Sequence, residues 1–305
     1  MDYTLEYPDI PAERIDKYIN MQLSDLSRSY IQQLIKQNNI LVNGKVCKAN
    51  YKCQPYDQIT ISYQEAKELE VIPENIPLDI VYEDNSIVIV NKPKDMVVHP
   101  AVGHPNGTLV NALLYHCKDS LSSINGVIRP GIVHRIDRNT TGVLVVCKND
   151  HAHKILAEQL KEHSITRKYH AICYGTFKED TGTINAPIGR HPIDRKKMAI
   201  NYKNGREAIT HYRVLKTLKN NYSYIECTLE TGRTHQIRVH MASINHPLLG
   251  DDVYGPKNSK IKDLIGQTLH AKTLGFIHPD TKQYIEFDSD LPEYFQNLLE
   301  KLDTL

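Results

Sequence analysis

The residues with the clearest chemical potential form one polar cluster, which runs from His134 to Gly142. It interrupts the string GIVHRIDRNTTGVLVVCKND, in which an apolar run stands on either side. A loop that carries charged groups between buried strands holds them on a rigid scaffold where a substrate can reach them. Asp137, close to Arg135, is therefore a candidate functional group. The same pattern is also typical of a turn closed by a local arginine-aspartate pair, and periodicity alone does not separate the two.

The sequence motifs that are typical of metal sites and of nucleotide-binding sites are absent from this chain. His235 and His240 stand five residues apart, and no H-E-x-x-H motif or C-x-x-C pair occurs. Neither G-x-G-x-x-G nor the P-loop motif is present. We therefore expect no metal and no nucleotide cofactor. The six cysteines are scattered, which favours reduced structural thiols over a disulfide framework.

Positive charge is concentrated locally, although the net charge is only +1. Residues 12–64 hold seven Lys/Arg against four acids, and residues 190–206 hold six against the single acid Asp194. Local basic patches, rather than the total charge, govern binding to nucleic acid. An isolated basic run is more often a solvated face, so each patch by itself leaves both interpretations open.

The N-terminal segment has the pattern of a small α/β module. RIDKYINMQ is a short amphipathic stretch, and Ser29 with Gln32 three residues later is typical of a capping box that starts a second helix. The following ILVNGKVCK alternates around an Asn-Gly turn, as a hairpin does. Residues 14–17, 27–29 and 42–44 carry a pattern that resembles the S4 RNA-binding domain.

Two residues depart from that S4 pattern where glycine is usual. Asn39 stands at the expected helix end, and because asparagine tolerates positive φ this is a mild change. Tyr56, before Asp57, is a less conservative replacement.

A domain boundary is predicted by residues 65–78, which combine acids with two prolines and lack periodicity. We therefore expect an S4-like domain over 1–72, with its core at about 12–64 and a linker to about 78, and a second domain over 79–305. In that domain Thr108 and Asp150 are candidate helix caps. The expected helices cover 109–117 and 152–163, and the expected strands cover 87–90, 143–146, 169–173 and 224–229. Their irregular mixture favours an α+β fold.

The polar cluster also carries a resemblance to a known enzyme family. His134 to Asp137, followed by Thr140 to Gly142, resembles the H-R-L-D-x-x-[TS]-[ST]-G signature of the RluA-type pseudouridine synthases, with isoleucine for leucine. Four further strings resemble motifs of that family in the family's order: NKPKDMVVHP, RKYHAICYG, TGRTHQIRVHMASINHPLLGDDVYG and LHAKTLGFIHP. They span about 80 to 280, and one isolated motif would be far less specific.

The resemblance implies an enzyme that isomerises uridine to pseudouridine in RNA. Its fold would be α+β: an S4 domain, then a mixed, mostly antiparallel β-sheet domain flanked by helices and loops. Asp137 would attack C1′ or remove the 2′ proton. Arg233 would be the cation that keeps Asp137 ionised, and Tyr169 would pack on the uracil. The sequence does not choose between the two chemical routes.

The RNA itself would be held by basic residues. A stacked uridine is out of reach, so the target must be flipped into the pocket, with Arg135 filling the vacated space. The remaining predicted RNA contacts are Arg14, Lys17, Arg28, Arg190, Arg195, Lys196, Lys197 and Arg206.

Large-subunit (23S) ribosomal RNA, alone or in a pre-ribosomal particle, is the favoured substrate. A tRNA-directed synthase of the same family and a non-catalytic S4-type assembly factor remain alternatives, as does a hydrolase built on two carboxylates. No apolar run approaches the length that spans a bilayer, and the acidic N-terminus lacks an export signal, so we expect no membrane association and a cytoplasmic protein.

Overall fold

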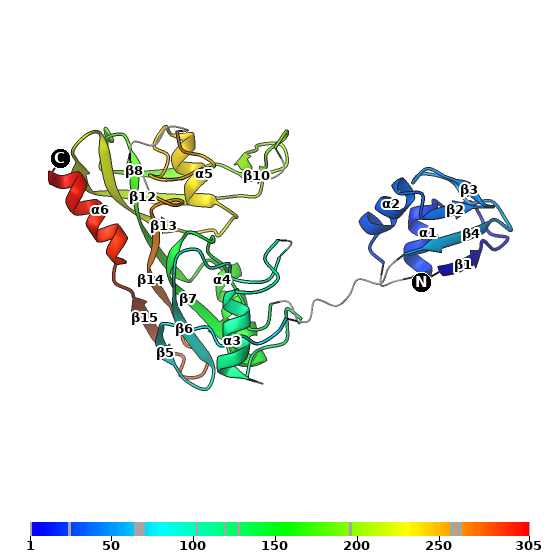
Figure 1. The fold of residues 1–305 in the computed structure, drawn as a ribbon, viewed down its shortest axis with the longest axis horizontal. Coiled ribbons are helices and arrows are strands. Elements are labelled where there is room, and N and C mark those ends of the chain that lie inside the picture. Colours follow the sequence, from blue (N-terminus) through cyan, green and yellow to red (C-terminus); the bar gives the residue numbers. More distant parts are fainter. Residues whose placement is uncertain are drawn as a thin grey trace. The chain divides into compact units, whose positions relative to one another are not determined.

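The computed structural model describes residues 2–23, 26–63, 71–101, 103–118, 120–126, 129–194, 197–256, 261 and 264–304. The chain divides into two compact units, Met1–Glu68 and Leu69–Leu305. Figure 1 shows the elements of both units. Each unit has its own hydrophobic core.

The N-terminal unit is an antiparallel sheet accompanied by two helices. Its strands are β1 (Asp2–Glu6), β2 (Ile40–Val42), β3 (Lys45–Val46) and β4 (Gln58–Ser62), in the order β1-β4-β2-β3. The helices are α1 (Ile15–Gln22) and α2 (Arg28–Lys36). Their core is mostly aliphatic, with Ile15, Ile19, Ile31, Ile59 and Ile61 fully buried. The Asn-Gly hairpin between β2 and β3 is present, with Asn43 and Gly44 both at positive φ.

Two local expectations in this unit were wrong by one or two residues. Helix α2 is capped by Ser27, whose hydroxyl accepts a hydrogen bond from the Tyr30 amide, and Ser29 already lies within the first turn. Gln32 does not close a capping box, because its amide donates to buried Asp16 instead. At the helix end the left-handed residue is Asn38, not Asn39, while Tyr56 does adopt positive φ.

The second unit is built around a nine-stranded, mostly antiparallel sheet. Its strand order is β5-β6-β7-β14-β8-β13-β12-β9, with β15 paired to β14, and β7 beside β14 is the parallel pair. The strands are β5 (Ile80–Glu83), β6 (Ile87–Lys92), β7 (Thr141–Cys147), β8 (Thr166–Tyr174), β9 (Thr181–Asn185), β12 (Ile209–Leu218), β13 (Tyr222–Leu229), β14 (Leu269–Ile277) and β15 (Tyr284–Asp288). A separate hairpin pairs β10 (Ile188–Arg190) with β11 (Met198–Ile200). The predicted α+β class is confirmed.

Four helices accompany this sheet: α3 (Leu109–Cys117), α4 (Asp150–Lys161), α5 (Gln236–Ser243) and α6 (Glu293–Thr304). Thr108 caps α3 as predicted, and Asn111 completes a capping box with it. Helix α4 is capped by Asn149, so the prediction of Asp150 is one residue late. Among the described residues, no helix is long and apolar enough to cross a membrane.

Both faces of the central strands are buried, which explains their continuous apolar sequences. Successive strand residues point to opposite faces. Val88 and Val90 of β6 accordingly pack in one core with α3, whereas Ile87 and Ile89 pack in a second core with α4. The sequence of a strand that is buried on both faces does not alternate between apolar and polar residues.

Part of the segment predicted as linker packs with the second unit. Residues 64–70 lie outside the described residues, but residues 71–78 belong to the second unit. Val71 is buried in its core, and the Asn111 side chain of α3 donates to the carbonyl of Ile72 at 2.8 Å. Glu74 also receives the Gly107 amide.

Candidate active site

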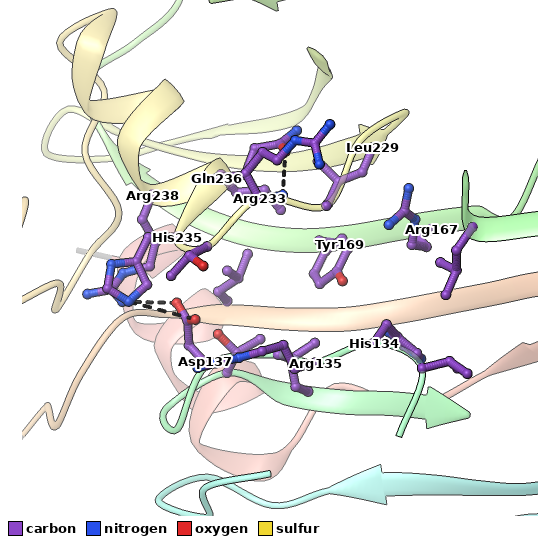
Figure 2. A pocket seen from close by; sticks show the side chains of 18 of the residues that line it. His134, Arg135, Asp137, Arg167, Tyr169, Leu229, Arg233, His235, Gln236 and Arg238 are labelled. Carbon is purple, nitrogen blue, oxygen red and sulfur yellow. Dashed lines mark hydrogen bonds and ion pairs between the residues drawn. The ribbon is translucent and has the colours of Figure 1, made fainter. Parts of the chain in front are cut away.

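Four neighbouring elements of the second unit bring four of the five predicted motifs to one pocket. It has a volume of about 540 Å³, and residues from the loop before β7, from β8, and from the segment between β13 and α5 line it. Because β7, β14, β8 and β13 are adjacent in the sheet, segments distant in sequence meet there. Figure 2 shows Asp137, Tyr169, Arg233 and Arg238 around this space.

The loop that carries Asp137 is fixed by glycine at its end. Gly142 has φ +112°, and a Cβ at this position would lie 2.2 Å from the carbonyl oxygen of Ala271 on β14. Only glycine tolerates both the dihedral angle and the close approach. The glycine of the polar cluster therefore lets β7 pair with β14 immediately after the loop. On the other side, the Lys92 ammonium donates to the Arg138 carbonyl at 3.0 Å.

The cation that pairs with Asp137 is Arg238, not the predicted Arg233. Arg238 Nη1 lies 2.9 Å from Asp137 Oδ2. The Arg233 guanidinium instead donates from Nε to the Glu207 carbonyl at 2.8 Å, and within the described chain it forms no ion pair with Asp137. Arg233 still lines the pocket. The prediction of its role beside Asp137 was wrong in this structure.

Arg238 is held in place by a second carboxylate. Its Nε and Nη2 donate to the two oxygens of Asp251 at 2.7 and 2.9 Å, a bidentate geometry. Burial opposes the charge of Arg238, but the hydrogen bonds to Asp251 and Asp137 outweigh it and raise the pKa of the guanidinium above its ordinary value. Burial likewise acts to raise the pKa of Asp251, yet the bond from Arg238 lowers it overall. The guanidinium is thus charged and oriented before any substrate arrives.

The signal for Arg238 is its burial within α5, which the sequence pattern did not predict. Every residue of α5 from Gln236 to Met241 is buried, and an arginine inside such a helix requires a buried acceptor. His235, which the sequence analysis also missed, precedes α5 in a left-handed conformation. Its Nε2 lies 3.9 Å from Asp137 Oδ1, and its Nδ1 shares a 2.9 Å hydrogen bond with the Tyr254 hydroxyl.

Tyr169 lies in the same pocket on β8, as predicted from its motif. The residue is 8% exposed, and burial raises the pKa of its hydroxyl; the charge of Arg167 opposes that rise and the charge of Asp137 adds to it. The phenol is therefore protonated near neutral pH. Within the described residues its hydroxyl makes no hydrogen bond, so it is available to a ligand.

The predicted RNA contacts fall into three places. Arg14 and Arg28 of the N-terminal unit both bind buried Asp16, at 2.9 and 3.1 Å, and Lys17 pairs with Glu13. Arg135 is exposed beside Asp137 and lines the pocket. The third group, on and around the β10–β11 hairpin, contains Arg190, Lys197 and Arg206. Arg195 and Lys196 lie outside the described residues.

One cluster in the described residues has metal-ligand atoms within reach of each other: Glu83, His116 and Cys117. Its carboxylate is already used, because His116 and Lys148 bind the two oxygens of Glu83 at 2.8 and 2.7 Å. None of its residues lines the pocket around Asp137.

Comparison with known proteins shows two matches to family models. Residues 86–243 match the model described as RNA pseudouridylate synthase, and residues 13–59 match the S4 domain. The first match contains the Asp137 loop, β8 and α5.

Curated relatives match over nearly the whole chain. The RNA pseudouridine synthase YlyB of Bacillus subtilis is 52% identical, covering 95% of this chain and 94% of its own length. The protein named ribosomal large subunit pseudouridine synthase D is 45% identical in Zymomonas mobilis and 42% in Escherichia coli; each covers 95% of this chain, with 93% and 90% of its own length. Among solved structures, human RNA pseudouridylate synthase domain containing 1 aligns with a TM-score of 0.57 at 25% identity, over 79% of this chain and 98% of its own.

Proposed function

The chain belongs to the RNA pseudouridylate synthase family, and from this premise we propose that it isomerises uridine in large-subunit ribosomal RNA with Asp137 as the catalytic group. The observation that carries the assignment of Asp137 is its ion pair with Arg238 inside a pocket that also holds Tyr169. The ribosomal substrate is supported by the relatives named ribosomal large subunit pseudouridine synthase D.

The reaction breaks the bond from C1′ to N1, turns the uracil within the pocket and joins C1′ to C5. Asp137 either attacks C1′ as a nucleophile or removes the 2′ proton, and both routes require an ionised carboxylate. Arg238 places a positive charge 2.9 Å from the carboxylate in a partly buried site, where the Asp137 side chain is 16% exposed. Nothing enters or leaves overall, so no redox partner is needed.

The target uridine has to leave its stack to reach this pocket. Asp137 and Tyr169 lie among strand ends and loops that a base inside a helix cannot approach. Exposed Arg135 is placed beside Asp137 and has a planar guanidinium suited to stacking in the vacated position. We assign it that role.

Two basic surfaces would grip the surrounding RNA. In the N-terminal unit, Arg14 and Arg28 keep 44% and 48% of their side chains exposed, although Asp16 fixes their direction. In the second unit the β10–β11 region contributes Arg190, Lys197 and Arg206. Phosphate contacts of this kind fix register and orientation without reading sequence. A cytoplasmic location stays a prediction.

Site-resolved pseudouridine mapping tests the substrate. Ribosomal and transfer RNA from cells with and without the gene are treated with carbodiimide and reverse transcribed. We expect specific stops in large-subunit rRNA to disappear without the gene. Loss only in tRNA would replace the substrate but keep the enzyme class, and no loss anywhere would favour a non-catalytic assembly factor.

Complementation with Asp137→Asn tests the catalytic group. The amide cannot act as nucleophile or base, so we expect no stops to return, while RNA affinity in vitro stays within a few fold. Asp303→Asn is the matched control, because it removes a surface carboxylate that pairs with Lys216 at 2.7 Å far along the chain. Turnover by Asp137→Asn would refute the assignment, and release of free uracil would indicate a hydrolase.

A further inference from the structure

Arg167 on β8 is a buried cation without a carboxylate partner. The residue is 6% exposed, and within the described chain it forms no ion pair. Its Nη2 donates to the Glu230 carbonyl at 2.7 Å, and its Nε is buried with no hydrogen-bond partner. A buried charge is costly unless an opposite charge compensates it. No described residue supplies the missing negative charge, which leaves a bound ligand as its candidate source.

The position of Arg167 indicates where that charge would arise. Arg167 lines the pocket together with Asp137 and Tyr169, and it precedes Tyr169 by two residues, so both side chains leave the same face of β8. In Figure 2, Tyr169 lies between Asp137 and Arg167. A uridine whose ribose meets Asp137 and whose base packs on Tyr169 would direct the outer edge of the base toward Arg167.

The segment facing Arg167 leaves room for its free nitrogen. A Cβ on Gly232 would lie 2.7 Å from Arg167 Nη1, closer than side-chain atoms tolerate. Nη1 makes no hydrogen bond in the described chain. Unlike Nε, which is buried, it is accessible to solvent. Gly232 also lines the pocket. Nη1 of the guanidinium is thus open to a ligand, while Nη2 is held by its hydrogen bond to the Glu230 carbonyl.

His134 adds a second donor in the same pocket. The Val145 amide donates to His134 Nε2 at 3.1 Å, which places the proton of the neutral ring on Nδ1. Burial, aided by the charge of Arg167, lowers the pKa of His134 to about 3, so the ring is neutral. Nδ1 has no partner within the described residues. Two donors without acceptors therefore line the pocket.

We propose that Arg167, assisted by His134, binds a carbonyl oxygen of the target uracil and stabilises the negative charge on the detached base. When the C1′–N1 bond breaks, its electron pair stays on the uracil and spreads from N1 onto O2 and O4. Asp137 meanwhile forms a bond to C1′ or takes the 2′ proton. C5 then bonds to C1′ as the Asp137–C1′ bond breaks or, on the other route, as Asp137 returns the proton to C2′. C5 finally loses its proton and N1 gains one, which restores the Asp137 carboxylate. Donors aimed at a developing oxyanion act in the transition state more than in the ground state.

This inference rests on the proposed function, and the test combines enzyme variants with altered substrates. Single-turnover rates are measured on an RNA fragment with its mapped target as uridine, 2-thiouridine or 4-thiouridine. With uridine we expect Arg167→Met to be slower by about 100-fold at saturating RNA, the effect typical of one oxyanion donor, with RNA affinity within a few fold. Sulfur accepts hydrogen bonds poorly, so one thio substrate should slow the wild type markedly but slow Arg167→Met no further.

Two further variants distinguish loss of the Arg167 contact with the uracil from loss of the folded structure. Gly232→Ala keeps the charge but displaces Nη1, and we expect it to reproduce the rate loss with an unchanged melting temperature. It also carries the test if Arg167→Met does not fold. Lys168→Met, on the opposite face of β8, removes a charge from the same strand and should leave the rate unchanged.

Each remaining outcome decides between the two claims. Additive effects of variant and thio substitution would overturn the uracil contact, because residues that do not touch the altered atom do not couple to it. Weaker, less salt-dependent RNA binding with an unchanged saturating rate would indicate a phosphate contact and would also overturn it. A wild-type enzyme that leaves every unmodified uridine unchanged would instead refute the proposed function.

Discussion

Arg238 donates a 2.9 Å hydrogen bond to Asp137, although the two residues stand 101 positions apart in the sequence. The same guanidinium grips Asp251 with its other two nitrogens. The position of the Asp137 carboxylate is therefore tied, through Arg238, to the segment after α5. This arrangement makes Arg238 the residue on which Asp137 depends.

Replacing Arg238 should cost far more activity than replacing Arg233. Arg238→Met removes the cation beside Asp137, and we expect turnover to fall by about 100-fold or more. It also leaves Asp251 buried and unpaired, which should lower the free energy of unfolding by about 3–5 kcal/mol. Arg233→Met should cost less than about 10-fold, because within the described chain the Arg233 side chain donates only to a backbone carbonyl. Single-turnover rates beside denaturant unfolding curves measure both effects, and the reverse ranking would restore the original assignment.

Lys92 should prove necessary for the Asp137 loop. Its fully buried ammonium donates to the carbonyls of Pro93, Met96 and Arg138. Burial lowers the pKa of Lys92 to about 7, and Asp137 opposes that shift. Lys92→Met leaves three carbonyls without a donor, so we expect a stability loss of about 3 kcal/mol and slower turnover. Lys94→Met is the control, since it removes a neighbouring charge without these bonds. Equal melting temperatures for the two variants would contradict this role.

The N-terminal unit should lose stability in acid through Asp16. Burial raises the pKa of this carboxyl, but hydrogen bonds from Arg14, Gln32 and Arg28 outweigh it and lower the pKa from 3.8 to about 2. The stabilisation is therefore present above about pH 4 and is lost as the pH falls toward 2. The shift corresponds to about 2 kcal/mol. Asp16→Asn should destabilise the full chain at pH 7, and the difference from the wild type should shrink toward pH 2. A difference independent of pH would show that the charge contributes nothing.

The position of an N-terminal truncation should determine how stable the remaining second unit is. A protein that lacks residues 1–68 should bind RNA more weakly yet still isomerise uridine at saturating RNA, because Asp137, Tyr169 and Arg238 lie in the second unit. Removing residues 1–78 also deletes Val71 and the segment bound by α3, so its melting temperature should be lower. If the shorter deletion binds RNA normally or cannot isomerise even at saturation, the division of labour is wrong.

The sequence by itself determined part of the fold and most of the candidate pocket: helices α3 and α4 were expected, whereas α5 and α6 were not. The apolar runs around His134–Gly142 predicted a buried strand on either side of a charged loop. Strand β7 does follow the loop, but the described residues before it form only an isolated bridge from Ile132 to Val146. Thr108 predicted its helix because a cap acts through bonds to amides within one turn. The caps predicted at Ser29 and Asp150 were wrong by one or two residues. Several neighbouring side chains can accept hydrogen bonds from the same backbone amides, so the sequence does not say which one does.

Only the tertiary structure decided which cation meets Asp137. Arg233 and Arg238 share one motif, and their spacing does not say which faces a loop about a hundred residues away. The choice depends on where β13 ends and α5 begins, because that turn directs Arg233 to a backbone carbonyl and Arg238 inward to Asp137 and Asp251. Sequence patterns report local spacing, whereas charge pairing in a buried site depends on how strands from distant segments are ordered in the sheet.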